Sequence, residues 1–407
     1  MAGQDAVGDG GEAGMGDGRR YVGAQERRAR LALRHRLAGA RRAAAPEEVA
    51  ASLVALHGTD PATVFLAVAA RLADPVKAVP ETERALYEDR TLVRMHGMRH
   101  TVFVFPAELT AVVHASTGRT VAARERASLL KDMAAAGAPD AAWLAEVEAS
   151  ALAVLARRGQ ATAAELTAEE PRLREQFAYA AGKSYEGVHT VSSRLLRVLG
   201  VEGKVVRGRP LGSWTSSQFR WAPAPEHPEL DAARAQADLL GRWLRVCGPA
   251  TEADLKWWTG WRVTEVRRAL AAVGAREVAL EEGTGYLAGD DHDPVTGPEA
   301  PWAALLPALD PTAMAWQRRD WYLAAELRPL LFDRSGNVGP TVWWNGRVVG
   351  GWAQRADGEI VWRIPDAGVR REAGTAVAAE AERLRGWLGA TRVTPRFRTP
   401  LERELSA

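Results

Sequence analysis

Three stretches of the chain share one pattern of apolar and polar positions. In each, an amphipathic helix ends, a short apolar strand follows, a Gly or polar turn reverses the chain, and a second strand returns. The alternation of apolar and β-branched residues around Gly predicts a two-stranded hairpin in each stretch. The three stretches are 85–105, 195–222 and 270–288.

The segments before the second and third hairpins also match each other. Both run from a helix through Gly and Ala-Thr to acidic residues that open a new helix. Thr162 and Thr251 are predicted N-caps, with Glu165 and Asp254 three positions later to complete each cap. The matching segments are VLARRGQATAAELT (154–167) and WLRVCGPATEADLKWWTG (243–260).

Helix, turn, second helix and hairpin is the order of a winged helix, and its repetition predicts tandem modules. The first copy would begin at 27–38 and continue through 46–60. After about residue 290, Trp, Val and Gly with turn residues predict a small β-barrel, with hairpin turns at Asn345-Gly346 and Asp357-Gly358. The expected fold class is therefore α+β. Its expected parts are a disordered tail (1–20), a winged helix (21–106), a helical connector (107–157), a second (158–224) and a third winged helix (229–290), and a barrel-like element with a closing helix (300–407).

Composition narrows the class of protein but does not identify a partner. The net charge is +2 over 407 residues, so any basic surface must be local. Cys247 is the only cysteine, which excludes an intrachain disulfide and a cysteine zinc site and favours a cytoplasmic protein. No apolar run approaches the roughly 20 residues of a membrane span. The eight histidines lack ligand spacing, so we expect no metal and no cofactor.

The second module carries the densest group of basic residues. Its second helix, expected at 186–199, places Arg194 and Arg197 three residues apart and therefore on one face. Lys183 and Ser184 precede that helix, where a helix N-terminus can bind phosphate. The alternative is that these are solvated surface charges.

The predicted hairpins carry further candidates for contact with double-stranded DNA, since a wing usually rests on the DNA backbone. Trp214 could reach a base or sugar, although packing is the alternative role for it. The remaining candidates are Lys204, Arg207 and Arg209 on the second hairpin, and Arg94, Arg99 and His100 on the first.

The stretch ALHGTDPAT (55–63) ends an apolar helical run with a polar cluster before Pro61. His57 at such a position can be structural, and Asp60 can be the N-cap of a helix at 61–72. We find no phosphate-binding Walker loop, no GxSxG and no HExxH in the sequence.

Five segments resemble the tandem winged-helix DNA glycosylases of azinomycin resistance and crosslink unhooking, from about Gln25 to the C-terminus. The resemblance implies three winged helices in a curve and a C-terminal β-barrel element. It also implies a catalytic Gln-x-Gln or Gln-x-Asp at a helix end in the first module, where this chain has His57-Gly58-Thr59. The segments are ALHGTDPATVFL, TLVRMHGMRHTVFVFPAEL, VRGRPLGSWTSSQFRWAP, LLPALDPTAMAW and NGRVVGGW.

The implied activity is hydrolysis of the N-glycosidic bond of an N7-alkylated purine, possible also for bulky or crosslinked lesions. Such a base is cationic and departs without protonation, so the site must hold a water and stabilise an oxocarbenium-like sugar. Neutral His57 and the Thr59 hydroxyl can each donate and accept hydrogen bonds, as a Gln amide does. Asp60 could orient His57 or stabilise positive charge.

Two other functions remain open from the residues. One is a non-catalytic DNA-binding protein, a regulator or lesion binder on the same fold. The other is an interaction scaffold, which the near-neutral net charge permits. For all of these we expect a monomer.

Overall fold

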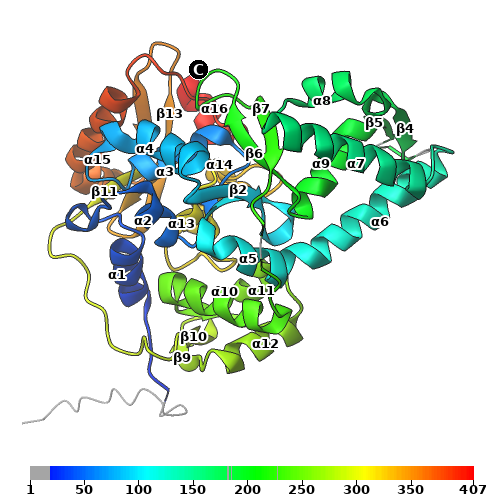
Figure 1. Cartoon of the computed structure of the whole chain (residues 1–407). Coiled ribbons are helices and arrows are strands. Elements are labelled where there is room, and N and C mark those ends of the chain that lie inside the picture. The colour runs from blue at the N-terminus through cyan, green and yellow to red at the C-terminus, as the bar shows by residue number, and fades with distance from the viewer. Residues whose placement is uncertain (1–18, 181–182, 185, 227) are drawn as a thin grey trace, which may run out of the picture.

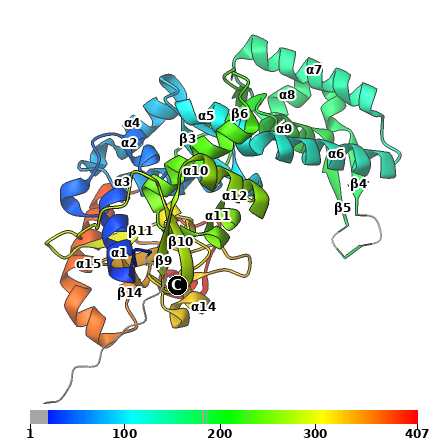
Figure 2. The same ribbon diagram turned by 90° about the horizontal axis from the view of Figure 1, so that it is seen from below.

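The computed structural model describes residues 19–180, 183–184, 186–226 and 228–407. Helices and antiparallel sheets make up the structure, which agrees with the expected α+β class. A compact body carries an arm, formed by α6 to α9 with β4 and β5, that extends to one side (Figures 1 and 2). No helix in the described part of the chain is both long and apolar enough to cross a membrane.

The first unit, 24–106, contains a three-stranded sheet in the order β1-β3-β2. Pro61 at the first turn and Asp60 as N-cap start the helix that follows β1. The helices are α1 (Ala24–Arg34), α2 (Pro46–Ala51), α3 (Pro61–Ala69) and α4 (Ala78–Glu83), and the strands are β1 (Leu56–His57), β2 (Leu92–His96) and β3 (Val102–Pro106).

Three helices connect this unit to the second, which spans 163–223. The expected capping box between Thr162 and Glu165 is present at the start of its first helix. The connector consists of α5 (Thr110–Val113), α6 (Arg119–Ala135) and α7 (Ala141–Arg158). The second unit consists of α8 (Ala163–Glu169), β4 (Gln176–Tyr179), β5 (Gly187–Thr190), α9 (Val191–Val201), β6 (Val205–Pro210) and β7 (Phe219–Pro223).

One expected boundary in the second unit is wrong. The helix predicted at 186–199 begins at Val191, because residues 187–190 form β5 and pair with β4. The Thr190 side chain caps the helix by accepting from the Ser193 amide. The second unit therefore carries an extra hairpin, β4–β5, at the end of the arm (Figure 2).

The third unit, 232–287, repeats the order of helices followed by a hairpin. Its second helix starts with the expected capping box of Thr251 and Asp254. Arg27, Arg30 and Arg34 of α1 are paired with acidic residues of this unit's hairpin and the loop after it. The elements are α10 (Ala232–Cys247), β8 (Ala250–Thr251), α11 (Glu252–Thr259), α12 (Val263–Ala272), β9 (Arg276–Leu280) and β10 (Gly283–Leu287).

The C-terminal region contains a four-stranded antiparallel sheet in the order β11-β12-β13-β14. Its outer strands β11 and β14 lie at opposite edges, so the sheet is open where a small barrel was expected. The Asn345-Gly346 turn joins β12 to β13 as predicted, with both residues at positive φ. The elements are β11 (Ala303–Leu306), α13 (Pro311–Met314), α14 (Arg328–Leu331), β12 (Thr341–Trp344), β13 (Arg347–Gln354), β14 (Ile360–Arg363), α15 (Ala367–Leu388) and α16 (Pro400–Ser406).

The sheet of the first unit is covered on both faces by parts of the chain that are distant in sequence. Phe103 and Phe105 belong to a core shared with Trp243 of the third unit and Trp343 of the C-terminal sheet. Val104, on the opposite face of β3, packs in a second core with α3, α15 and the C-terminal sheet. The second unit has its own core, and β2 lies beside β6 at the seam between the first two units.

Candidate functional site

The stretch His57 to Asp60, called the HGTD loop below, begins at the end of strand β1 and not at the end of a helix. Helix α2 ends at Ala51, and His57 pairs with Phe103 in the sheet. The Gly58 amide donates to the Val102 carbonyl at 2.8 Å, and a Cβ on Gly58 would lie 3.2 Å from the Phe103 carbonyl carbon. The expected helix end is therefore wrong, because pairing with β3 extends the backbone before the loop.

His57 is neutral at physiological pH in this environment. Its side chain is 9% exposed and meets the edge of Phe103 at 5.3 Å between ring centroids. Burial, and secondly the positive charge of Arg99, lower the pKa of His57 to about 4. The Nδ1 atom is buried and has no hydrogen-bond partner among the described residues. A neutral imidazole with a vacant nitrogen can still accept or donate one hydrogen bond.

A small cavity adjoins His57. Its volume is about 20 Å³, and its walls include His35, Arg99, Phe103 and Trp258. One buried water needs roughly 10–15 Å³ of such volume and two or more polar partners. The space is therefore large enough for one water, with His57 and Arg99 as polar groups in a wall that is mostly apolar.

Asp60 has both carboxylate oxygens engaged by backbone amides. Oδ1 accepts from the Ala62 amide at 3.1 Å and caps α3, and Oδ2 accepts from the Arg396 amide at 2.9 Å. The side chain is buried. Asp60 thus fixes the end of the HGTD loop to the C-terminal segment. Thr59, which lies between Gly58 and Asp60, is half-buried.

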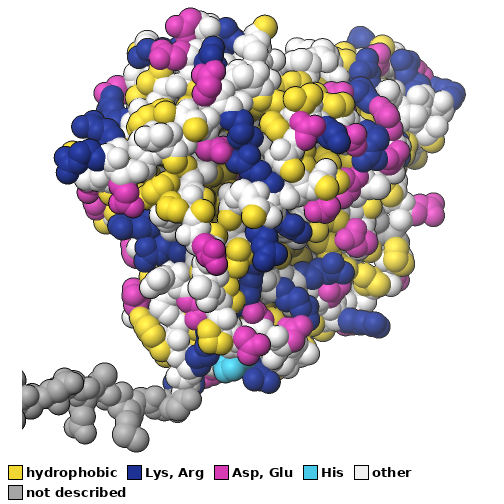
Figure 3. Space-filling model, turned by 90° about the vertical axis from the view of Figure 1, so that its left-hand side faces the viewer, with side chains coloured by type: hydrophobic (Ala, Val, Ile, Leu, Met, Phe, Trp, Pro, Cys, Tyr) yellow, Lys and Arg dark blue, Asp and Glu magenta, His cyan; other side chains and the backbone are white. Residues whose placement is uncertain are grey.

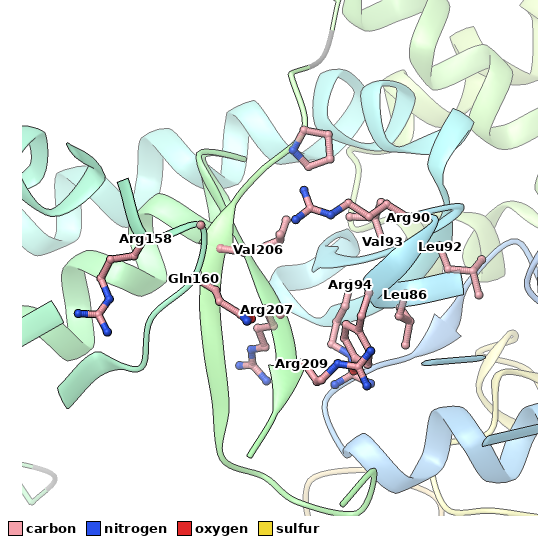
Figure 4. A pocket seen from close by; sticks show the side chains of 15 residues that line it. Leu86, Arg90, Leu92, Val93, Arg94, Arg158, Gln160, Val206, Arg207 and Arg209 are labelled. Carbon is pink, nitrogen blue, oxygen red and sulfur yellow. The ribbon is translucent and has the colours of Figure 1, made fainter. Parts of the chain in front are cut away.

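A second feature is a cationic pocket at the seam of the first two units, called the seam pocket below. Its volume is about 300 Å³, and its walls include Arg94 of β2 and Arg207 and Arg209 of β6. Figure 4 shows these arginines on two neighbouring hairpins, with apolar Val93 and Val206 beside them. The pocket combines positive charge with an apolar wall.

Arg94 and Arg207 carry their charge here without an acidic partner among the described residues. Arg94 is only 4% exposed, and its Nε and Nη2 atoms have no hydrogen-bond partner there. The Arg207 guanidinium lies over the Phe219 ring at 4.5 Å. Burial, then the nearby Arg94, Arg396 and Arg197, lower the pKa of Arg207 to about 10. A buried ion without a counter-charge costs on the order of several kcal/mol, so this cluster favours binding of an anion.

The other basic candidates near the seam are paired with acidic residues of this chain. The Arg209 pairs are the most exposed and contribute about 0–1 kcal/mol, so a DNA phosphate can replace them, whereas the acidic partners of Lys204 are mostly buried. On the face shown in Figure 3, too, basic and acidic side chains are interspersed. The pairs are Lys204 with Glu148 and Glu202, Arg209 with Glu83 and Glu88, Arg194 with Asp132, and Arg197 and His100 with Glu125.

Two further candidates lie elsewhere than the sequence suggested, and a third has a packing role. Lys183 and Ser184 lie in the connection between β4 and β5, ahead of the N-cap Thr190, and not at a helix N-terminus. Trp214 packs against Phe65 at 5.2 Å and Trp387 at 5.7 Å between ring centroids, which is the packing alternative.

Arg99, at the turn between β2 and β3, contacts the third unit. Its guanidinium lies over the Trp257 ring at 4.1 Å, and that of Arg319 lies 5.1 Å from the same ring. Sequence reasoning missed Arg319, and also Arg396 beside the HGTD loop. Neither has a local motif, because each reaches the site from the C-terminal region only after folding.

Among the described residues, no group of three or more His, Cys, Asp or Glu side chains could hold a metal ion. The arrangement can therefore be described by its protein groups: a neutral imidazole beside a water-sized space, and a separate cluster of cations.

Comparison with known proteins identifies the family of this chain. No curated protein sequence matches the chain. The solved structure of Streptomyces sahachiroi DNA glycosylase AlkZ is similar in fold, with a TM-score of 0.66 and 20% identity over 92% of this chain and 98% of that chain. A family model described as "DNA glycosylase AlkZ-like" matches residues 50–387, which include the HGTD loop and the seam pocket. The chain therefore belongs to the AlkZ-like DNA glycosylase family.

Proposed function

We propose that this protein is a DNA glycosylase that hydrolyses the N-glycosidic bond of N7-alkylated purines in double-stranded DNA, including bulky or crosslinked ones. The observation that carries the proposal is the vacant, buried Nδ1 of His57 beside a space for one water, within a glycosylase family. His57 and Thr59 are the residues proposed to hold the water for hydrolysis, and of the two only His57 is among the residues that line this space.

The chemistry asks little of the protein as a proton donor. Water oxygen bonds to C1′ of the sugar, the C1′–N9 bond breaks, and its electron pair neutralises the cationic base. The water then loses one proton to solvent. Because the pKa of His57 is about 4, the imidazole orients the water as a neutral acceptor and does not retain its proton. Asp60, with both oxygens engaged, positions the loop in this proposal and does not contact substrate.

DNA binding is proposed to use the three helix-and-hairpin units as winged helices. Each unit has a hairpin after its helices, and in two of them a short preceding strand joins that hairpin, β1 on β3 and β8 on β10. Basic residues on the first two hairpins and on α9 then contact phosphates. We propose a monomer acting in the cytoplasm, where the buried Cys247 stays reduced.

The test is base excision from a duplex that carries one N7-alkylguanine, read as strand cleavage at that site after heating with base. His57→Ala and Thr59→Ala should slow excision, by about 10²-fold or more for His57→Ala if it orients the water. His57→Gln supplies an amide that can also donate and accept, so it should retain more activity than His57→Ala. His292→Ala, in the loop after the third hairpin, is the matched control. Unchanged excision in His57→Ala would remove His57 from the mechanism.

A second candidate is a DNA-binding protein without glycosylase activity. It is favoured by the low exposure of His57 and by the full engagement of Asp60. This alternative predicts salt-dependent binding of duplex DNA with no release of any base from a panel of small and bulky N7 adducts.

A further inference from the structure

We propose that the seam pocket is a binding site for one phosphate group, held by Arg94 of the first unit, Arg207 of the second and the hydroxyl of Tyr87. The site is separate from the HGTD loop. Its assignment to a DNA phosphodiester rests on the proposed function, whereas its affinity for a phosphate group does not.

Arg94 gives the first step of the argument. It is the central residue of β2, the edge strand that pairs with β3, where it lies opposite Val104, and its side chain lines the pocket. A guanidinium this deeply buried normally has a carboxylate or several carbonyl partners, yet two of its nitrogens have none among the described residues. Its unused donors are therefore available to a ligand with acceptor oxygens.

The second step is the sign of the surrounding charge. The groups that act on Arg207 are Arg94, Arg396 and Arg197, all cations, and of these Arg197 is itself paired with Glu125. At the rim of the pocket, Arg209 and Arg158 are paired with their own glutamates. The uncompensated charge is thus concentrated inside the pocket, where an anion would meet it with little competition from solvent.

Tyr87 supplies a third donor. Its ring lines the pocket, and its hydroxyl oxygen is buried without a partner among the described residues. Burial raises the pKa of Tyr87, so the hydroxyl keeps its proton and can donate it. Two guanidinium groups and one hydroxyl are a set of donors that suits phosphate oxygens.

Pocket size selects the class of ligand. About 300 Å³ exceeds the volume of one phosphate, and the apolar side chains of Leu92, Val93 and Val206 line the remainder. A phosphate with a sugar or second substituent attached fits this combination. Because Arg94 and Arg207 belong to different units, such a ligand would also hold the two units together.

The experiment compares wild type with Arg94→Met and Arg207→Gln, using inorganic pyrophosphate and an undamaged DNA duplex as probes. Pyrophosphate should raise the melting temperature of the wild type and not that of either variant. Duplex affinity at 0.15 M salt should fall about tenfold or more in the variants, and the slope of log affinity against log salt should decrease by about one. Arg267→Gln, which removes an exposed arginine paired with Glu252, is the control for a general loss of charge.

The two probes separate the possible sources of the phosphate. Loss of the duplex effect identifies a backbone phosphodiester, and loss of the pyrophosphate effect alone identifies a free phosphate compound. Equal responses of the wild type and both variants to both probes would overturn the site. A protein that binds in this way but excises no base would contradict the proposed function and leave the phosphate site intact.

Discussion

Two buried arginines of the first unit differ in how their positive charge and their hydrogen-bond donors are compensated. Arg71 is fully buried and forms a bidentate pair with Asp310 at 2.7 and 2.9 Å. It also donates to the Thr312 hydroxyl and to the carbonyls of His35 and Ala67. Arg94, at 4% exposure, has neither an acidic partner nor hydrogen bonds for two of its nitrogens among the described residues.

The difference indicates which buried charge belongs to the scaffold and which belongs to a ligand. Every donor direction of Arg71 ends on an atom of the chain, so it joins the first unit to the C-terminal region. The donors of Arg94 end in a pocket. Burial alone therefore does not separate a structural arginine from a binding one, whereas hydrogen-bond satisfaction does.

Breaking the ion pair between Arg71 and Asp310 should have the largest effect on stability. Arg71→Met leaves the Asp310 carboxylate buried without its partner, and it should lower the free energy of unfolding by about 3–5 kcal/mol. Urea denaturation followed by circular dichroism measures the change. A loss below about 1 kcal/mol would show that the pair is not the structural link described above.

Lowering the pH should have the next largest effect on stability. It should act through one histidine near Arg71 and another near the seam pocket. Burial is the main cause that lowers the pKa of His35, beside Arg71, and of His96, near Arg207, to about 3 each. Below the ordinary pKa of 6.5 the unfolded chain binds protons that the folded chain does not, so stability falls as pH falls. Between pH 7 and pH 5, each histidine should lower the free energy of unfolding by about 2 kcal/mol.

The measurement is urea denaturation of His35→Gln and His96→Gln at pH 7 and 5. Each variant should lose about 2 kcal/mol less between the two values than wild type does. Pyrophosphate in the seam pocket should reduce the contribution of His96 and leave that of His35 unchanged. An equal effect on both histidines would mean that the cationic cluster does not respond locally to an anion.

Substitution of Asp60 tests whether a carboxylate that is bonded only by backbone amides stabilises the fold as much as Asp310 does. Asp60→Ala removes the cap of α3 and the bond to the Arg396 amide, and should cost about 1–2 kcal/mol. Asp60→Asn keeps an acceptor and should cost less. If the two variants were equally unstable, the negative charge and not the capping geometry would be responsible.

Arg94→Met should have the smallest effect on stability. It removes a buried charge that lacks a counter-charge, so the free energy of unfolding should stay within about 1 kcal/mol of wild type or rise. Urea denaturation without added anions gives the value. Destabilisation as large as that of Arg71→Met would show that Arg94, like Arg71, is a structural residue and not a ligand-binding one.

The sequence predicts local features well where the signal is local. Both capping boxes, at Thr162 and Thr251, and the Asn345-Gly346 turn have short-range causes, and all three are present. The short strand at His57 has no periodicity to detect, since only its pairing with β3 defines it. Likewise the short strand β5 reads as part of a helix until β4 is known to pair with it.

The candidate site was predictable only in part. Arg94 and Arg207 could be named from the hairpins, but their lack of acidic partners within the described part of the chain depends on the fold. Lys204 and Arg209 looked equivalent to them in sequence, yet glutamates from other elements pair with both. Long-range packing decides which charge remains available, and a single sequence does not carry that information.

The bond between Asp60 and the Arg396 amide joins two positions that lie 336 residues apart in the chain. Until residue 396 has been synthesised and has packed against the loop, the HGTD loop lacks one of its two anchors. A chain truncated before Arg396 would therefore retain the residues of the seam pocket while its HGTD loop is held by the α3 cap alone.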